Sequence, residues 1–270
     1  MFQYDFMKKA FLVGIFISIV IPLIGTVVVN RKTSTIGDAL SHTTLSGIFL
    51  GVLLGFNPIV GGIVISILAA FSIELIRSKF PKNGDMATAI IMSFGIGLAS
   101  ILSDFIVAAQ NFESFLFGSI IAITYRDIIL TVIMSILVII AFVYTYYGLL
   151  AISINKNTAR LSGVNIKFND YLFTILLALT IALSARIVGI LIISSLMVLP
   201  VATAMLISKN YKNTVIISVI LGIIYFFLGL TSAYYLSLKP GGSIIMVSVI
   251  GLLLIILYKS FTSKQLKSIK

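Results

Sequence analysis

Long apolar runs separated by short polar gaps make up most of this chain of 270 residues. About 20 consecutive, predominantly apolar residues are enough for an α-helix to cross the hydrocarbon core of a bilayer. Runs of this kind recur from one end of the sequence to the other, which predicts an all-α, polytopic integral membrane protein with eight to nine transmembrane helices. The predicted spans are Ala10–Val29, Ile36–Leu54, Pro58–Ile76, Met86–Ala109, Ile128–Leu150, Tyr171–Ala185, Ile187–Ser208, Thr214–Leu236 and Ser243–Tyr258.

Two parts of this pattern need a separate interpretation. The apolar stretch Tyr171–Ser208 is too long for one span even when tilted, so we divide it where Ser184-Ala185-Arg186 interrupts it. The shorter apolar piece Phe112–Thr124 suits a re-entrant or interfacial helix better than a complete crossing. No change in composition marks a domain boundary, and residues 1–270 are expected to form a single membrane domain.

Composition indicates that lipid is the solvent for most of the chain. The sequence is 60% hydrophobic and 10% charged, whereas soluble domains have about 25% charged residues. It has no cysteine, which excludes disulfides and thiolate metal sites, and its single histidine excludes a cage of several histidines within one chain. The net charge of +11 does not indicate nucleic-acid binding, because most basic residues lie in gaps between apolar runs and form no stripe interleaved with aromatic residues.

The distribution of lysine and arginine predicts which side of the membrane each loop faces. If all nine runs are spans, 14 of the 19 basic residues fall on the side of the C-terminus, and the other five are Lys8, Lys9, Arg126, Arg186 and Lys239. Cytoplasmic loops carry the excess of positive charge, so the C-terminus is expected in the cytoplasm and the N-terminus outside, which Lys8 and Lys9 oppose. The first run is too long for most signal peptides and no small-residue cleavage site follows it, so we interpret it as a span.

The longest polar connection, Ile152–Asp170, has the sequence ISINKNTARLSGVNIKFND and lies on the predicted cytoplasmic side. It is too short to form a domain, but it is long enough for a helix along the membrane surface that a cytoplasmic partner could bind. An ordinary solvated loop explains the same composition, and both interpretations stay open.

A carboxylate and the only histidine share one turn of the second predicted span, in the segment GDALSH at Gly37–His42. Asp38 and His42 are four residues apart, so they lie on one face of a helix, and Thr35 and Ser46 extend the same polar stripe. Ionisable groups inside membrane segments usually face a bundle interior or water. A carboxylate and an imidazole suit borderline divalent metals such as zinc and manganese, and two ligands suit transient binding better than a closed structural site.

Two other interpretations of this pair stay open. Asp38 lies near the cytoplasmic start of its span, where the helix dipole favours an acid, and His42 could hydrogen-bond a neighbouring carbonyl. The pair could also relay protons.

In the fourth span, Asp104 is a candidate residue of the cation path if it lines an outer vestibule with Glu113, although an interfacial acid that reaches water explains it as well. No phosphate-binding loop, catalytic triad or pair of catalytic carboxylates is present, so the chain is not expected to be an enzyme.

Five segments, in order along the chain, together resemble the permease subunits of bacterial ABC importers for zinc, manganese and related metal cations. One departure is Ser46, since the family commonly has proline there, which affects the local shape of the helix. The segments are GDALSHTTLSGI at Gly37–Ile48, FLFGSIIAIT at Phe115–Thr124, ARLSGV at Ala159–Val164, IVGILIISSLMVLPVATA at Ile187–Ala204 and KPGGSIIMVSVIGLLLI at residues 239–255.

The resemblance implies a homodimer of this chain in the cell membrane, with two copies of a cytoplasmic ATPase docked around Ala159 and Gly163. It also implies that an extracellular or periplasmic metal-binding protein delivers the cation to the outer face. Asp38 and His42 correspond to residues associated with the cation path in that family, so the resemblance favours their coordination of the cargo, which is zinc or manganese, with iron as a third choice. No permanently bound cofactor is expected.

A secondary metal transporter or channel without an ATPase is the main alternative. Such a protein has no need of the segment TARLSGV in a cytoplasmic connection, and its sites tend to fall on broken helices in paired repeats, which this sequence does not show. An intramembrane metalloprotease would need more ligands than one histidine and a general acid beside them. The sequence therefore favours the ABC importer permease.

Overall fold

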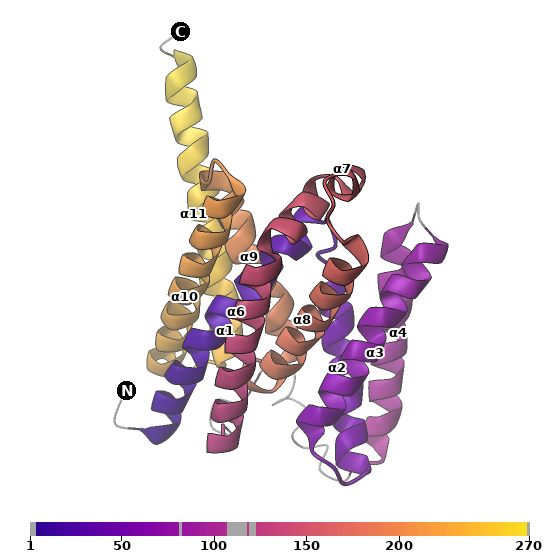
Figure 1. Cartoon of the computed structure of the whole chain (residues 1–270). Helices are drawn as coiled ribbons and strands as arrows, with labels where there is room; N and C mark the ends of the chain where they lie inside the picture. Colours follow the sequence, from indigo (N-terminus) through magenta and orange to yellow (C-terminus); the bar gives the residue numbers. More distant parts are fainter. Residues whose placement is uncertain (1–3, 81–82, 107–117, 119–122, 269–270) are drawn as a thin grey trace.

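The computed structural model of the chain describes residues 4–80, 83–106, 118 and 123–268. Within these ranges the chain folds into helices and forms no strand (Figure 1). The helices are α1 (Asp5–Asn30), α2 (Ile36–Leu53), α3 (Pro58–Lys79), α4 (Gly84–Asp104), α6 (Tyr125–Ile154), α7 (Lys156–Leu161), α8 (Ile166–Ile187), α9 (Ile190–Ile207), α10 (Tyr211–Leu236) and α11 (Pro240–Ser268).

Among the described residues, eight helices are long and apolar enough to cross a membrane, and α9 contributes a shorter apolar helix, Ile192–Ile207. The prediction of an all-α protein with eight to nine membrane helices is therefore confirmed. The two chain ends lie at opposite ends of the bundle, and α7 lies at the end that carries the C-terminus (Figure 1). An odd number of crossings gives this arrangement, with α7 on the side predicted to be cytoplasmic.

The break in the long apolar stretch lies later than the sequence pattern predicted. We placed it at Ser184-Ala185-Arg186, but α8 continues as a helix to Ile187 and α9 begins at Ile190. Gly189 between them has φ +94°, a conformation that glycine alone adopts readily. The backbone freedom of a glycine, rather than the charge of Arg186, ends this helix.

The polar connection predicted at Ile152–Asp170 is mostly helical. α6 continues to Ile154, α7 follows after one residue, and α8 has already begun at Ile166. Asparagine side chains explain where the later two helices begin, because the Asn155 side chain accepts from the backbone N–H groups of residues 157 and 158, and the Asn165 side chain accepts from that of residue 168. A short helix therefore occupies the connection, instead of a solvated loop.

Two predicted features extend beyond the described residues. The fourth span was expected to run to Ala109, whereas α4 ends at Asp104, and positions 107–109 lie outside the described part. Most of the predicted re-entrant piece Phe112–Thr124, including Glu113, also lies outside it. Of that piece, Thr124 caps the start of α6, where its side chain and that of Asp127 form a capping box.

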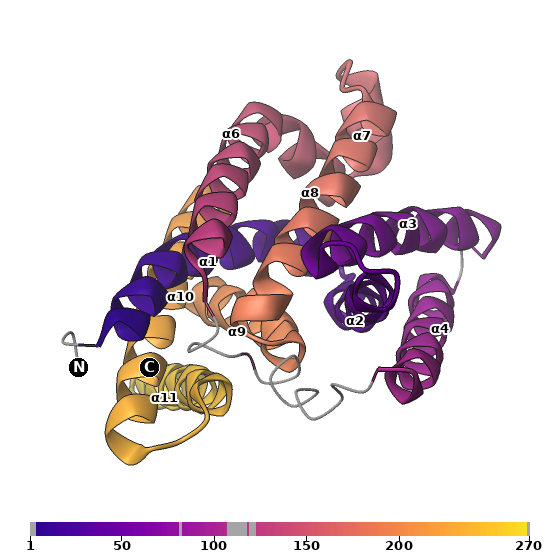
Figure 2. The same ribbon diagram turned by 90° about the horizontal axis from the view of Figure 1, so that it is seen from below.

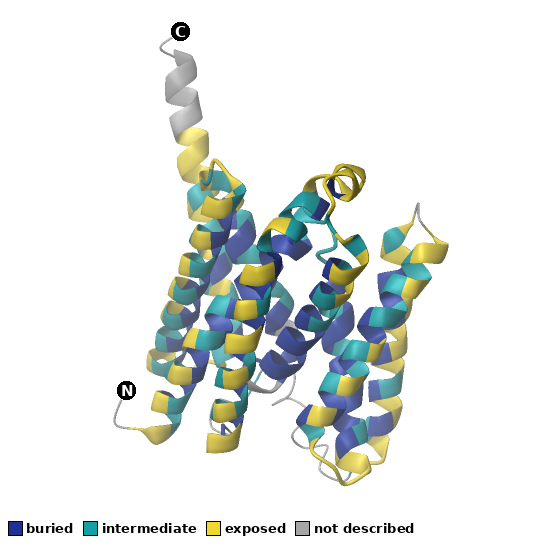
Figure 3. Cartoon of the chain, viewed as in Figure 1, coloured by how far each residue is buried: buried dark blue, intermediate teal, exposed yellow. Residues whose placement is uncertain are grey.

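The helices differ strongly in how much of their surface is buried within the chain. In α1 and α2, 72% of the residues in the membrane-crossing window are buried, whereas the fraction is 28% in α6 and 22% in α11. α2 lies among α3, α4, α8 and α9, which all contact it (Figure 2). The exposed faces of α6 and α11 are apolar, as lipid contact requires, while the buried residues gather in the middle of the bundle (Figure 3).

Glycines bring the backbones of α2 and α3 into direct contact. A Cβ atom built on Gly47 would lie 2.5 Å from the carbonyl oxygen of Gly61, and a Cβ on Gly61 would collide with the carbonyl oxygen of Gly47. Small residues at such a crossing allow close packing of membrane helices, since apolar side chains gain little by leaving lipid. This contact fixes the position of α2, the helix that carries Asp38 and His42.

Candidate functional site

Asp38 and His42 occupy the first two turns of α2, directly after the turn that follows α1. Both side chains are half-buried. Within the described residues, neither makes a hydrogen bond or an ion pair, so the structure gives His42 no carbonyl partner of the kind that a purely structural role would need. Among the described residues the two groups thus have no hydrogen-bond partner that competes with a ligand, and the first turn of the helix favours the charge of Asp38.

The pair faces outward between two neighbouring helices. A Cβ on Gly37 would lie 3.5 Å from Met197 Sδ, so this side of α2 faces α9, whereas Ser46 donates a hydrogen bond to a carbonyl of α4. Successive residues on a helix differ by about 100° in direction. Asp38 and His42 therefore point about 100° and 140° from Gly37, between the sides that meet α9 and α4.

The other residues predicted for the cation path have different surroundings. Ser46 is buried, and its hydroxyl donates to the carbonyl oxygen of Gly95 at 2.7 Å, which ties α2 to α4. Thr35 is exposed at the N-terminal end of α2. Asp104 is the exposed last residue of α4, about 13 Å along that helix from Gly95. The structure thus brings Ser46 close to the pair but not Asp104.

The described part of one chain offers two metal ligands at this site. No group of three or more histidine, aspartate and glutamate side chains that could hold a metal ion occurs among the described residues. Zinc sites usually have four ligands and manganese prefers more, so Asp38 and His42 can supply only part of a coordination shell. A cation held by this pair keeps water or takes ligands from elsewhere, which suits passage better than storage.

The predicted docking segment forms a short helix at the end of the bundle that is predicted to be cytoplasmic. Ala159 of α7 is 2% exposed and anchors the helix against the bundle, while Gly163 has φ +79° in the turn that follows. Leu161, the last residue of α7, was not among the predicted docking residues, and its apolar side chain is 89% exposed. The signal that could have found it is a single leucine within an otherwise polar stretch.

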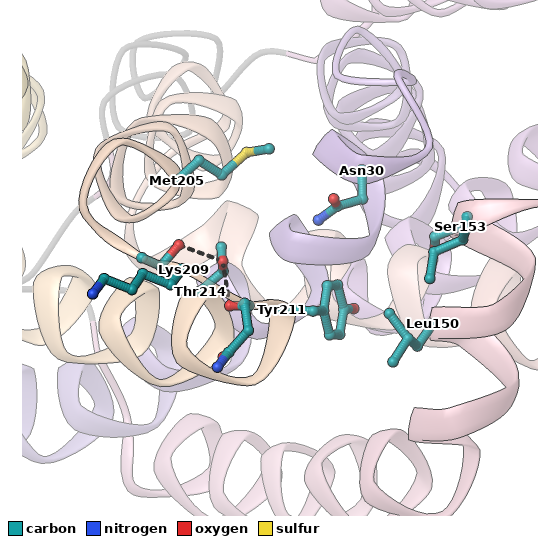
Figure 4. Close-up of a pocket in the computed structure, with 10 residues that line it drawn as sticks. Asn30, Leu150, Ser153, Met205, Lys209, Tyr211 and Thr214 are labelled. Atoms are coloured by element: carbon teal, nitrogen blue, oxygen red, sulfur yellow. Dashed lines mark hydrogen bonds between the residues drawn. The ribbon is translucent and has the colours of Figure 1, made fainter.

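Two hollows open at the same end of the molecule, and neither includes Asp38 or His42. The first has a volume of about 290 Å³, and Thr214, one of its lining residues (Figure 4), shares a hydrogen bond of 2.6 Å with the hydroxyl of Ser208. It has no carboxylate in its lining, so it lacks the chemistry of a metal site. Its lining residues are Asn30, Leu150, Ser153, Ile154, Met205, Ser208, Lys209, Asn210, Tyr211 and Thr214.

The second hollow, of about 670 Å³, contains a charged cluster that the sequence pattern did not predict. Asp170 of α8 lies 3.0 Å from Arg31 Nη1 with one carboxylate oxygen and 2.9 Å from Lys156 Nζ with the other. The guanidinium of Arg31 also lies over the ring of Phe173, 4.7 Å from its centre. These residues come from three separate parts of the chain, so no local spacing could reveal their contact.

Comparison with known proteins shows what the whole chain is similar to. A model of the family described as the ABC 3 transport family matches residues 3–259. The chain is 34% identical over 257 residues to a probable metal transport system membrane protein of Treponema pallidum, covering 95% of this chain and 96% of the relative. It is 32% identical to the high-affinity zinc uptake system membrane protein ZnuB of Haemophilus influenzae, covering 91% of this chain and 95% of the relative.

Other matches are similar in extent. The manganese transport system membrane protein MntC of Listeria monocytogenes is 29% identical, with 92% of this chain and 89% of the relative covered. The solved structure of PsaBC from Streptococcus pneumoniae in complex with Fab superimposes with a TM-score of 0.85 at 28% identity, covering 94% of this chain and 91% of that chain. A putative metal-chelate type ABC transporter in an inward-facing conformation shares the fold, with a TM-score of 0.74 at 16% identity over 93% of this chain and 85% of the other.

Proposed function

The chain belongs to the ABC 3 transport family, and on that premise we propose that it is the membrane-spanning permease of an ATP-binding-cassette importer for divalent metal cations. It is a multi-pass protein of the plasma membrane, with eight described helices long and apolar enough to cross it. Its relatives include membrane subunits of zinc and manganese transport systems. We assign ATP hydrolysis to a separate subunit, because this chain is the part that lies in the membrane.

One observation carries the choice of cargo. A half-buried carboxylate and imidazole lie on one face of a largely buried helix, and no described side chain takes up their hydrogen bonds. Keeping Asp38 and His42 unpaired in a membrane protein is costly unless a ligand uses them. A partly dehydrated zinc or manganese ion is a ligand that fits one oxygen and one nitrogen donor.

The incomplete shell supports a dimer as the working unit. The face with Asp38 and His42 lies between the sides of α2 that meet α9 and α4, where it is only half-buried. A second copy of the chain that packs there supplies the same two donors, so that two carboxylates and two imidazoles surround the cation. Weak, exchangeable binding in such a shell lets the ion enter from a delivery protein outside and leave toward the cytoplasm.

α7 is the surface on which we place the cytoplasmic ATPase. It projects at the cytoplasmic end of the bundle and packs against α6 and α8 (Figure 1). Ala159 is buried and holds the helix in place, while Leu161 presents an apolar side chain outward. A partner that docks on α7 would remove this side chain from water, which favours association.

The test is transport by the reconstituted complex. The permease, co-expressed with a cytoplasmic ATPase subunit that co-purifies with it, is placed in lipid vesicles and supplied with radioactive manganese or zinc. We expect accumulation of the metal only with ATP and only when both subunits are present. Accumulation by the permease alone would instead identify a secondary transporter or channel.

A further inference from the structure

Asp170 joins two segments that have different tasks in the proposed function. One of its carboxylate oxygens lies 3.0 Å from Arg31, directly before the turn that leads into α2, and the other lies 2.9 Å from Lys156, the first residue of α7. A single side chain therefore connects the docking helix to the start of the helix with the metal-binding pair. We propose that Asp170 is the positioning residue through which movement of α7 reaches α2, an inference that rests on the proposed function.

The connection from Arg31 to α2 is short and stiff. Lys32, the next residue, has φ +56°, a left-handed conformation that residues other than glycine seldom adopt. Backbone hydrogen bonds hold the turn, with the N–H of Lys32 donating to Val29 and that of Thr33 donating to Val28, both at 3.0 Å. A displacement of Arg31 is therefore passed to the first turn of α2, where Asp38 lies.

The two contacts of Asp170 are unequal in strength. The side chains of Arg31 and Asp170 are only 17% and 14% exposed, whereas that of Lys156 is 57% exposed. Removing one partner of a buried ion pair is strongly destabilising, while an exposed pair contributes little and exchanges readily. The contact with Lys156 is thus the one that docking can break and remake, while Arg31 stays bound to Asp170.

The surroundings of Arg31 explain why it follows Asp170. Burial lowers the pKa of Arg31, and the carboxylate of Asp170 opposes this effect by stabilising the charged guanidinium. Phe173, three residues after Asp170 on α8, holds the other side of the guanidinium at 4.7 Å from its ring centre. Arg31 is therefore clamped to α8 and moves with it.

The test compares coupling with assembly in the reconstituted complex of permease and ATPase. Asp170→Asn keeps the size of the side chain and removes its charge, and Lys156→Gln removes only the exposed contact. We expect both variants to retain the ATPase and to hydrolyse ATP within about twofold of the wild type, while manganese taken up per ATP falls at least about tenfold for Asp170→Asn and severalfold for Lys156→Gln. A purely structural ion pair would change the yield of folded complex instead of this ratio.

Glu74→Gln is the matched control: Glu74 lines the same hollow and acts on Arg31 through its charge but without an ion-pair contact, and its ion pair among the described residues is with Arg77, at 3.7 Å and with greater exposure. It should leave uptake per ATP unchanged. Wild-type uptake per ATP in Asp170→Asn, or an equal loss in Glu74→Gln, would overturn the inference. If Asp170→Asn does not fold, uptake per ATP in Lys156→Gln provides the test, and a wild-type value in that variant would overturn the inference. The wild-type complex separates the two proposals, because its failure to couple ATP to uptake would refute the proposed function itself.

Discussion

The hydroxyl of Ser46 in α2 donates a hydrogen bond to the backbone carbonyl of Gly95 in α4 across 2.7 Å, and the two residues are 49 positions apart in sequence. The bond lies one helical turn beyond His42, so it fixes the distance between the two helices beside Asp38 and His42. Its strength depends on burial, since Ser46 is fully inaccessible to solvent.

Replacing Ser46 with alanine tests whether this residue packs helices or contacts the cargo. Loss of one buried hydrogen bond should reduce stability by about 1 kcal/mol, and metal uptake per folded molecule should stay at the wild-type level. The measurement is uptake of radioactive manganese normalised to folded permease in the membrane. A clear drop in normalised uptake would place the Ser46 oxygen on the cation path.

Asp38 and His42 should matter through their donor atoms. Asp38→Asn keeps the volume and removes the charge, and His42→Ala removes the only imidazole of the chain. Each change should lower normalised metal uptake at least tenfold, which corresponds to a barrier higher by about 1.4 kcal/mol. If the pair has a structural role only, protein levels should fall while the molecules that remain transport normally.

Thr44→Val provides the control for these two variants. Thr44 is buried on the same helix, and its hydroxyl donates only to the carbonyl of Leu40 at 2.6 Å. The substitution removes a polar group from another face of α2 with almost no change in shape. Uptake per folded molecule should therefore persist, and an equal loss in this variant would show that α2 tolerates no change at all.

Leu161→Asp should weaken the binding of the ATPase. The substitution places a charge where an exposed apolar side chain is expected to enter the partner, so the amount of ATPase that co-purifies should fall at least tenfold. Leu161→Met keeps the apolar surface and should retain the complex. Full co-purification with Leu161→Asp, together with coupled transport, would remove this residue from the docking contact.

Gly163→Glu addresses the turn after α7. No atom lies within 4 Å of a Cβ built at this position, but its φ of +79° strains any residue except glycine. The variant should insert normally and lose the ATPase, because the turn that presents α7 changes shape. Gly163→Ala carries the same backbone strain without a charge, and a comparison of the two in co-purification separates shape from electrostatics.

Gly47→Ala should destabilise the crossing of α2 and α3. The added methyl group would overlap the carbonyl of Gly61, and overpacking of this kind costs about 1–3 kcal/mol. Gly97→Ala in α4 is the matched control, since nothing lies within 4 Å of its Cβ position and alanine favours helices. Thermal unfolding in detergent should show a midpoint lower by several degrees for Gly47→Ala and no decrease for Gly97→Ala.

The positions of the membrane helices could be predicted from the sequence because lipid imposes one requirement on each of them, a run of about 20 predominantly apolar residues. The predicted spans Ile36–Leu54 and Pro58–Ile76 agree closely with α2 and α3. The break at Gly189 was missed because a charged residue nearby gave a stronger signal than a glycine, although only the glycine can adopt the required φ. Hydrophobicity reports contact with lipid and not backbone geometry.

Part of the candidate site could likewise be predicted from the sequence, and part could not. Asp38 and His42 could be found because the helical repeat places residues four apart on one face. The contact of Arg31 with Asp170 depends on how α1 and α8 pack, and no pattern within either segment specifies that packing. The hydrogen bond of Ser46 was hidden for the same reason, since its partner is a backbone carbonyl and leaves no trace in the side-chain sequence.

The deep burial of α2 also has a consequence for how the protein is made. α2 is the least apolar of the eight spans found among the described residues, yet it is among the most buried, and its neighbours α3, α4, α8 and α9 all follow it in the chain. When the ribosome releases α2 for insertion, only α1 is available to shield its aspartate and histidine from lipid. Its stable entry into the bilayer therefore depends on helices synthesised later. In a chain truncated after α2, the more apolar α1 would still cross the membrane, whereas α2 itself would insert poorly.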